Sequence, residues 1–301
     1  MQWLLRAICM LAFLFASGCR EPVVTDVEDA HPTSFESPYF TVSVSGAGPD
    51  VILMPGLASS AAVWDDTVAA LNDRYRFHVV QVSGFAGAPA RGNNDNPNVL
   101  DDLAAGLASY TKSLDQAPAI VGHSLGGVVT LKAALDPDSK LDRIVIVDVL
   151  PFFSVLMDDQ ATSDSIAPVA AIMKTGLLAQ SEDVFAVRQA DALRALVKGE
   201  DNLQKTLTWS IDSDRAVMAQ SMSEVLTTDL RADIAAINIP TTIIYARDDE
   251  IPNMLAIDAF YEDLYAPLKN GAVVPIDGAL HFIMLDQPAA FAVALEEALQ
   301  R

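Results

Sequence analysis

A serine that lies between two glycines is the residue of this chain best suited to covalent chemistry. Residues 122–126 read G-H-S-L-G, a G-x-S-x-G pattern that follows the apolar run 119–121 and precedes an apolar segment with helical spacing, 128–135. Glycines on both sides let the chain turn sharply from a strand into a helix, because they carry no side chain that could clash. Backbone N–H groups at the start of that helix point toward a developing negative charge. The pattern predicts that Ser124 is a nucleophile.

A serine nucleophile needs a base, and the chain has four histidines, His31, His78, His123 and His281. His31 lies in a polar N-terminal stretch, and His78 lies inside a strand-like run. His123 is next to the serine, so we expect its ring to point away from the turn. His281 follows the strand-like run 272–276 and occupies a loop from which it could reach a serine on a neighbouring strand. Elimination therefore favours His281 as the general base.

Strands and helices alternate along most of the chain, which predicts an α/β fold with a mostly parallel sheet and helices on both faces. Strand-like runs occur near residues 39–45, 51–55, 77–82, 118–122, 143–149, 241–246 and 272–276. Helical patterns cover 61–72, 99–114, 126–135, 253–265 and 288–300.

From Tyr39 to its C-terminus the chain resembles the α/β-hydrolase superfamily, in its esterase- and lipase-like branch. Beside G-x-S-x-G, the segment 51–57 (V-I-L-M-P-G-L) is similar to the family's H-G segment, with proline in place of histidine. Trp64 and the run from His281 to Pro288 also match. The loop 81–87 (Q-V-S-G-F-A-G) lacks the acid and the arginine of the family's D-x-R-G-x-G. The resemblance implies that the backbone N–H groups of Leu57 and Leu125 form the oxyanion hole.

The family order Ser…Asp/Glu…His implies that an acid lies between Ser124 and His281. Three acidic residues, 248–250, follow the strand-like run 241–246. The position of Asp249 after the strand end makes it the favoured acid, and its neighbour Asp248 is the first alternative. Asp148, which follows the strand-like run 143–147, is a second alternative. Any of these carboxylates could orient the imidazole of His281.

The segment 151–237 interrupts the alternation, because it contains helical patterns and no strand pattern. These patterns cover 166–178, 182–198, 202–211 and 215–227. In the α/β-hydrolases a helical cap is found here, and the resemblance implies a cap between strands six and seven. A cap that covers the nucleophile limits the size of the substrate. Six apolar residues of the segment are candidates for its pocket: Phe152, Phe153, Leu156, Met157, Phe185 and Trp209.

The N-terminus predicts export. Residues 1–6 carry one positive charge, residues 7–15 are apolar, and the small residues 16–18 precede Cys19. The apolar run is too short for a comfortable membrane span of about 20 residues, which is typical of a secretory signal. The small residues before a cysteine resemble a bacterial lipoprotein signal, which implies cleavage before Cys19 and lipid attachment there. The alternative is a soluble periplasmic or secreted protein.

The expected organisation is a signal peptide (1–18), a flexible tether (19–38), a first core segment (39–150), the cap (151–237) and a second core segment (238–301). The residue after Cys19 is Arg20 rather than an aspartate, and by resemblance to bacterial lipoproteins this favours a location in the outer membrane of a Gram-negative cell. The cysteines are Cys9 and Cys19, so the processed chain would have no disulfide and no cysteine-based metal site. A formal charge of −21 argues against nucleic acid as a partner.

These observations predict an exported, membrane-anchored serine hydrolase that cleaves small or medium carboxylic esters through an acyl-enzyme on Ser124, without metal or organic cofactor. The same residues could serve a thioesterase, an amidase, a C–C hydrolase or a cofactor-free haloperoxidase. A binding lipoprotein that retained the fold is the non-enzymatic alternative. Dehalogenases and epoxide hydrolases of similar fold are disfavoured, because they have an aspartate where this chain has Ser124.

Overall fold

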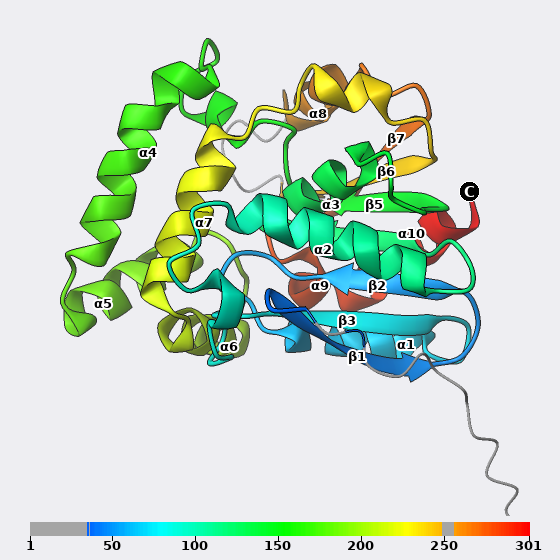
Figure 1. The fold of residues 1–301 in the computed structure, drawn as a ribbon, viewed down its shortest axis with the longest axis horizontal. Helices are drawn as coiled ribbons and strands as arrows, with labels where there is room; N and C mark the ends of the chain where they lie inside the picture. The colour runs from blue at the N-terminus through cyan, green and yellow to red at the C-terminus, as the bar shows by residue number, and fades with distance from the viewer. Residues whose placement is uncertain (1–34, 36, 249–255) are drawn as a thin grey trace, which may run out of the picture. The chain divides into compact units, whose positions relative to one another are not determined.

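The computed structural model of the protein describes residues 35, 37–248 and 256–301. Within these residues seven strands form one sheet in the order β1-β3-β2-β4-β5-β6-β7 (Figure 1). β1 pairs antiparallel with β3, and every other pair is parallel. The strands are β1 (Phe40–Gly46), β2 (Asp50–Met54), β3 (Arg76–Val82), β4 (Ala119–His123), β5 (Arg143–Val147), β6 (Thr241–Arg247) and β7 (Gly271–Asp277). The predicted mostly parallel sheet is confirmed.

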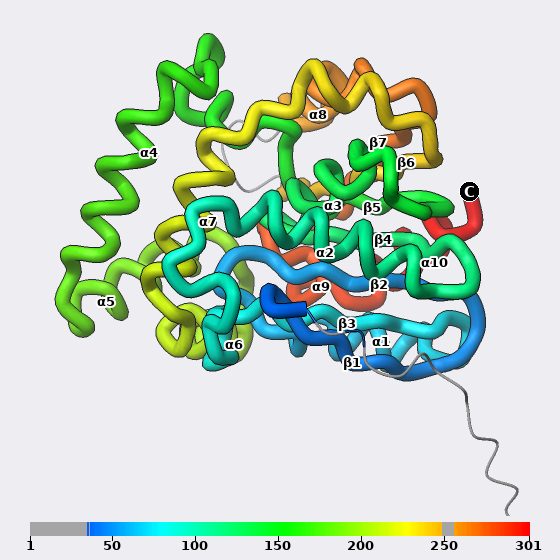
Figure 2. The backbone as a smooth tube through the Cα atoms, viewed as in Figure 1, coloured from blue at the N-terminus to red at the C-terminus, as the bar shows by residue number. Residues whose placement is uncertain are grey.

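Helices cover both faces of the sheet, as the alternating sequence pattern predicts. One face carries α2 (Val99–Ser113), α3 (Leu125–Leu135) and α8 (Ile257–Tyr265), and the other carries α1 (Asp65–Leu71), α9 (Ile283–Asp286) and α10 (Pro288–Gln300). The tube in Figure 2 follows the same path from α1 to the C-terminal helix α10. The short 3-10 helix η1 (Ala61–Trp64) leads into α1.

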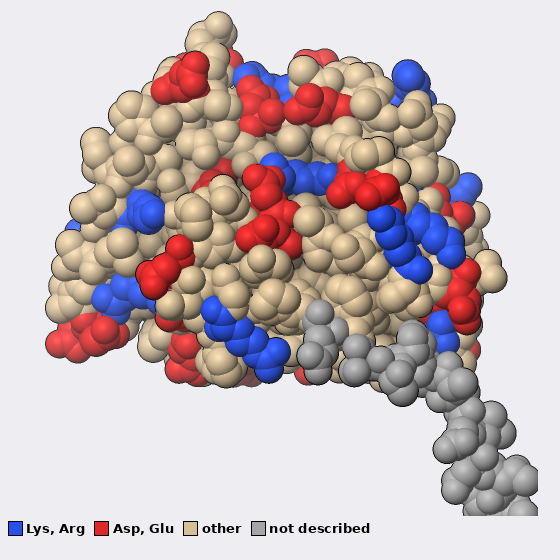
Figure 3. Space-filling view, in the orientation of Figure 1, with Lys and Arg blue, Asp and Glu red and all other residues tan. Residues whose placement is uncertain are grey.

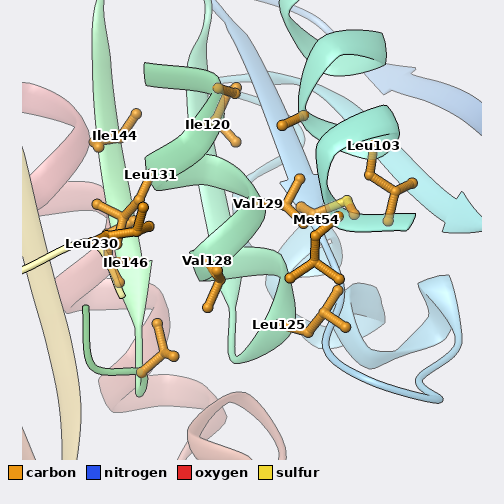
Figure 4. Close-up of a cluster of buried hydrophobic side chains, with 14 of the residues drawn as sticks. Met54, Leu103, Ile120, Leu125, Val128, Val129, Leu131, Ile144, Ile146 and Leu230 are labelled. Carbon is orange, nitrogen blue, oxygen red and sulfur yellow. The ribbon is translucent and has the colours of Figure 1, made fainter. Parts of the chain in front are cut away.

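Successive residues of the buried strands point to opposite faces, so the sheet separates two hydrophobic clusters. Ile120 of β4 and Ile146 of β5 pack against α2 and α3, as Figure 4 shows for part of this cluster. Val121 of β4 and Val145 of β5 face the other way, toward α1 and α10. Because both faces are covered, these strands read as continuous apolar runs rather than alternating ones.

The helical segment of the chain lies between β5 and β6. It contains η3 (Phe153–Leu156), α4 (Ser163–Leu178), α5 (Glu182–Leu193), α6 (Glu200–Asp212) and α7 (Arg215–Thr227), and ends with η4 (Asp233–Ala236). The expectation of a cap between strands six and seven is therefore wrong. Five strands of the described sheet, β1 to β5, precede the cap, in agreement with the five strand-like runs before residue 151; the position between strands six and seven was implied by the family resemblance alone.

Two helix pairs build the cap. α4 packs along α7, and α5 packs against α6, and Figure 1 shows α4 at the outer side of the cap. Several apolar side chains of α4 are exposed, among them Ile172 at 72 %. In Figure 3 much of this side of the molecule is uncharged, with a few acidic and basic groups between the uncharged areas. Cap and core belong to one compact unit.

The predicted signal peptide and Cys19 lie outside the described residues, as do Asp249 and the start of the predicted helix 253–265. Among the helices that the structure describes, none combines the length and the apolar composition that a membrane span requires.

Candidate active site

The parallel register brings the carboxyl ends of β2, β4, β5 and β6 together at one edge of the sheet. Met54 lies beside Gly122, His123 lies beside Val147, and Val147 lies beside Ile244. The residues that follow these pairs therefore meet above the sheet edge, where α/β folds bind their ligands. Ser124 and Asp148 each come directly after one of these strands.

Ser124 occupies the sharp turn between β4 and α3. Its φ of 53° and ψ of −123° lie in a region that residues with a side chain rarely adopt. Its N–H donates to the carbonyl of Val147 at 2.9 Å, which ties the turn to the neighbouring strand. The turn also needs Gly126, because a Cβ there would lie 2.5 Å from the carbonyl oxygens of Met54 and Pro55. The strained turn predicted from G-x-S-x-G is thus present.

The loop after β2 comes close to Ser124. A Cβ on Gly56 would lie 3.1 Å from the Cβ of Ser124 and 2.9 Å from Nδ1 of His123, so this position favours glycine. The N–H of the next residue, Leu57, has no acceptor among the described residues, and the N–H of Leu125 opens α3, where helical N–H groups lack partners. Both residues line the same cavity as Ser124. Two unpaired backbone donors beside a serine suit an oxyanion hole.

His281 is held in the loop after β7 by its neighbours on both sides. Leu280 donates its N–H to Asp286 Oδ2 at 2.8 Å, and Phe282 donates its N–H to the carbonyl of Leu196 in the cap at 3.0 Å. The side chain of His281 is 20 % exposed and lines the cavity that Ser124 also lines. The structure thus brings the predicted nucleophile and the predicted base into one cavity.

Asp148 is the acid that pairs with His281. Its Oδ2 lies 2.7 Å from Nδ1 of the imidazole. Its Oδ1 accepts from the N–H of Ala246 at 2.8 Å and from the hydroxyl of Tyr261 at 3.1 Å. Burial and the adjacent Asp148 carboxylate raise the pKa of Tyr261, so its hydroxyl remains a donor. Two donors, the N–H of Ala246 and the hydroxyl of Tyr261, therefore fix the carboxylate against the imidazole. Asp148 adopts a left-handed φ of 48°.

The sequence favoured Asp249 as the acid, and that residue lies outside the described part of the chain. Its neighbour Asp248 is buried, at 4 % exposure, and forms an ion pair with Lys198 of the cap. Nδ1 of His281 is already paired with Asp148, so the geometry favours the second alternative of the sequence analysis over Asp248. Asp148 follows the parallel strand β5 and the acidic residues 248–250 follow the parallel strand β6, so the sequence pattern alone did not show which of them is the acid.

His123 is a residue of the site that sequence reasoning missed. Its ring is fully enclosed, and its Nε2 lies 2.9 Å from the main-chain carbonyl of His281, to which it donates. The two imidazole rings lie 4.6 Å apart between centroids. Burial, with a smaller contribution from the neighbouring His281, holds the pKa of His123 well below its ordinary value of 6.5. His123 is therefore neutral, and it links the turn of the nucleophile to the loop of the base.

The cavity above Ser124 has a volume of about 470 Å³, within the range of small-molecule sites. Most of its lining is apolar and comes from both the core and the cap. Among the described lining residues Asp148 is the one carboxylate, and none is a lysine or an arginine. The wall thus suits an uncharged, largely apolar molecule of small or medium size.

Three of the six residues predicted to line the pocket do so, namely Phe153, Leu156 and Trp209. Phe152 is instead buried in the core beneath the guanidinium of Arg231, and Phe185 packs in a separate cluster beside Arg215. Met157 is 49 % exposed and is not part of the described lining. Hydrophobicity alone did not distinguish these roles.

Within the described residues, no three or more His, Cys, Asp or Glu side chains come together in a group that could hold a metal ion.

The chain matches the Alpha/beta hydrolase family over residues 51–294 and belongs to it. The predicted family is confirmed, and with it the prediction that the protein is a hydrolase. The matched region contains all of the site residues described above, from Gly56 to His281.

Curated relatives are similar over most of their length. The chain is 24 % identical to a pimeloyl-[acyl-carrier protein] methyl ester esterase of Aeromonas hydrophila, over 83 % of this chain and 95 % of that protein. It is 27 % identical to the protein of the same name in Aliivibrio fischeri, over 78 % of this chain and 88 % of that one.

Solved structures share the fold. A hydrolase from Pseudomonas aeruginosa superposes with a TM-score of 0.70 at 20 % identity, over 87 % of this chain and 94 % of that one. A thermophilic esterase from Thermogutta terrifontis gives a TM-score of 0.69 at 18 % identity, over 87 % and 93 % of the two chains.

Proposed function

We propose that the protein hydrolyses carboxylic esters of small or medium, largely apolar substrates through an acyl-enzyme on Ser124. The hydrogen bond between Asp148 Oδ2 and His281 Nδ1, at 2.7 Å inside the cavity that contains Ser124, carries this proposal. It leaves Nε2 of His281 as the nitrogen that can take a proton from a serine. The esterases among the curated relatives support the same reaction class.

In the proposed mechanism His281 accepts the proton of Ser124 while the serine oxygen attacks the ester carbonyl. The N–H groups of Leu57 and Leu125 stabilise the oxyanion of the tetrahedral intermediate, a contribution of about 10²–10³ in rate for each donor. Asp148 keeps the imidazole in the correct tautomer and stabilises its positive charge. The protonated His281 then gives its proton to the leaving alcohol. Water attacks the acyl-enzyme by the reverse sequence, which releases the acid and restores the serine.

The test is a panel of p-nitrophenyl esters of increasing chain length, assayed with the full chain and with Ser124→Ala. We expect hydrolysis of short and medium chains by the wild type alone, because the cavity volume limits the acyl group. A fluorophosphonate probe should label the wild type and leave Ser124→Ala unlabelled. Failure of the wild type to react with both the probe and the esters would contradict the proposal, and would favour a binding protein that retained the fold.

We also propose that the protein is exported and attached to a membrane by lipid on Cys19. The support for this proposal is the sequence of residues 1–19, which lie outside the described part of the chain. The negative formal charge agrees with attachment through lipid rather than through attraction to an anionic surface.

A further inference from the structure

Most polar side chains on the cavity wall have hydrogen-bond partners within the protein. The hydroxyl of Ser59 donates to the carbonyl of Leu57 at 3.3 Å, and the hydroxyl of Thr206 donates to carbonyls of its own helix, α6, the nearer at 2.9 Å. These groups need nothing from a substrate. Gln189 of α5 differs from them.

Gln189 is bound at one end of its side-chain amide and has no partner at the other. Its Oε1 accepts from the hydroxyl of Ser210 on α6 at 3.0 Å, and Ser210 is itself 3 % exposed. The amide nitrogen of Gln189 has no acceptor in the part of the chain that the structure describes. Both residues line the cavity. The packing of α5 on α6 therefore presents two N–H donors at the cap wall.

A glutamine on the surface of the same helix pair behaves differently. Gln204 of α6 is exposed, and its amide nitrogen donates to Glu200 one turn earlier at 2.8 Å. The indole N–H of Trp209 also has no acceptor among the described residues, but its ring packs partly against the core cluster around Trp64. Gln189 is thus the cavity amide whose acceptor end is already paired and whose donor end is available.

The groups around Gln189 define the chemistry that it can bind. The lining next to it in sequence is apolar, namely Ala192, Leu193 and Leu196. A distal carboxylate or phosphate in this cavity would find no lysine or arginine among the described lining residues. A neutral carbonyl oxygen needs one donor and no counter-ion, so it matches this wall better than an anion does.

We propose that Gln189 binds a second carbonyl oxygen of the substrate, remote from the ester that is cleaved. The preferred substrates are then neutral esters in which an apolar chain separates two carbonyl groups, such as diesters or oxo-esters. This inference rests on the proposed esterase function. Gln189 acts in it as a specificity residue on the cap, while Ser124, His281 and Asp148 carry out the reaction.

The experiment compares dimethyl pimelate with methyl nonanoate, which has the same chain length and lacks the second carbonyl. We expect the wild type to prefer the diester by about three- to tenfold in kcat/KM beyond the statistical factor of two for its equivalent ends. Gln189→Leu should lose this preference, because leucine has no N–H that could donate to the second carbonyl. Gln204→Leu, on the surface of the cap, is the matched control and should keep the preference. Gln189→Met serves as a second variant if the leucine variant does not fold.

The outcomes separate this inference from the proposed function. If Gln189→Leu or Gln189→Met keeps the diester preference, or if the wild type shows none across a series of diester lengths, the role of Gln189 is overturned while the esterase stands. If monomethyl pimelate, which carries a distal carboxylate, is the better substrate, the neutral substrate class is overturned. If the wild type hydrolyses none of these esters nor the p-nitrophenyl panel, the proposed function itself fails.

Discussion

His123 donates its ring N–H to the main-chain carbonyl of His281 at 2.9 Å, across 158 positions of the sequence. The residue before the nucleophile thus holds the residue that serves as its base. The opposite ring nitrogen, Nδ1, is buried without a partner among the described residues and faces Gly56. One imidazole therefore touches the loop of the base and the loop of the oxyanion donors, so its replacement affects both.

Replacement of His123 tests this link. His123→Phe removes the donor and should lower kcat by about tenfold with little change in KM, because the base loses one support of its loop and the substrate cavity keeps its wall. His123→Gln places an amide N–H near the position of Nε2 and should recover much of the rate. Separate measurement of kcat and KM for one ester checks the prediction. Equal losses in the two variants would assign the ring a packing role alone.

The same residue gives a pH dependence of stability. Burial lowers the pKa of His123 in the folded protein, so below pH 6.5 the unfolded chain binds a proton that the folded chain does not. The stability contribution is complete above pH 6.5 and is lost as the pH falls toward the depressed folded value. The free energy of unfolding should fall by up to about 1.4 kcal/mol per pH unit. Urea unfolding between pH 7 and pH 5 gives the free energy of unfolding of the wild type and of His123→Gln at each pH. If this free energy depends on pH in the same way in both proteins, the prediction is contradicted.

Ser124→Ala should abolish ester hydrolysis and leave the fold intact. The hydroxyl of Ser124 makes no hydrogen bond among the described residues, and the left-handed φ is set by the turn, so alanine suffers the same strain. We expect a melting temperature within about two degrees of the wild type. Thermal unfolding and the ester assay on the same preparation check both parts. Retention of most of the activity would exclude Ser124 as the nucleophile.

Asp148→Asn should lower kcat by about ten thousandfold, because an amide no longer stabilises the charged imidazole and can favour the wrong tautomer of His281. Asp248→Asn and Asp249→Asn are the matched controls, and we expect much smaller effects on kcat from both. Asp248→Asn should mainly lower stability, since Asp248 is buried and paired with Lys198. A larger rate loss at Asp249 than at Asp148 would return the role of the acid to the residue that the sequence favoured.

Cys19→Ser should prevent lipid attachment and signal cleavage at that site. Cys9→Ser is the control, because Cys9 lies in the segment that cleavage would remove. Metabolic labelling with a palmitate analogue, followed by membrane fractionation, measures the result. We expect label in the wild type and in Cys9→Ser and none in Cys19→Ser. Equal label in the wild type and Cys19→Ser would exclude Cys19 as the lipid site.

The sequence by itself identified the residues whose local context is distinctive. Ser124 was recognisable because the strained turn requires a strand, two glycines and a helix in close succession. All of these signals lie within a short stretch of consecutive residues. His281 could be selected because the chain has so few histidines. The sheet and its helices were predictable for a similar reason, since apolar periodicity directly reflects which faces are buried.

The tertiary structure decided what depends on contacts between distant segments. The register of β4, β5 and β6 places the ends of these strands side by side, and the side chain that contacts the imidazole of His281 is Asp148, after β5. No local pattern distinguishes Asp148 from Asp249, because both follow buried parallel strands. The same holds for His123, whose partner is 158 positions away, and for Gln189, whose free amide depends on how α5 packs against α6. Local sequence determines the turns and which faces of the strands and helices are buried. A contact between side chains that are far apart in the sequence depends on how whole strands and helices pack together.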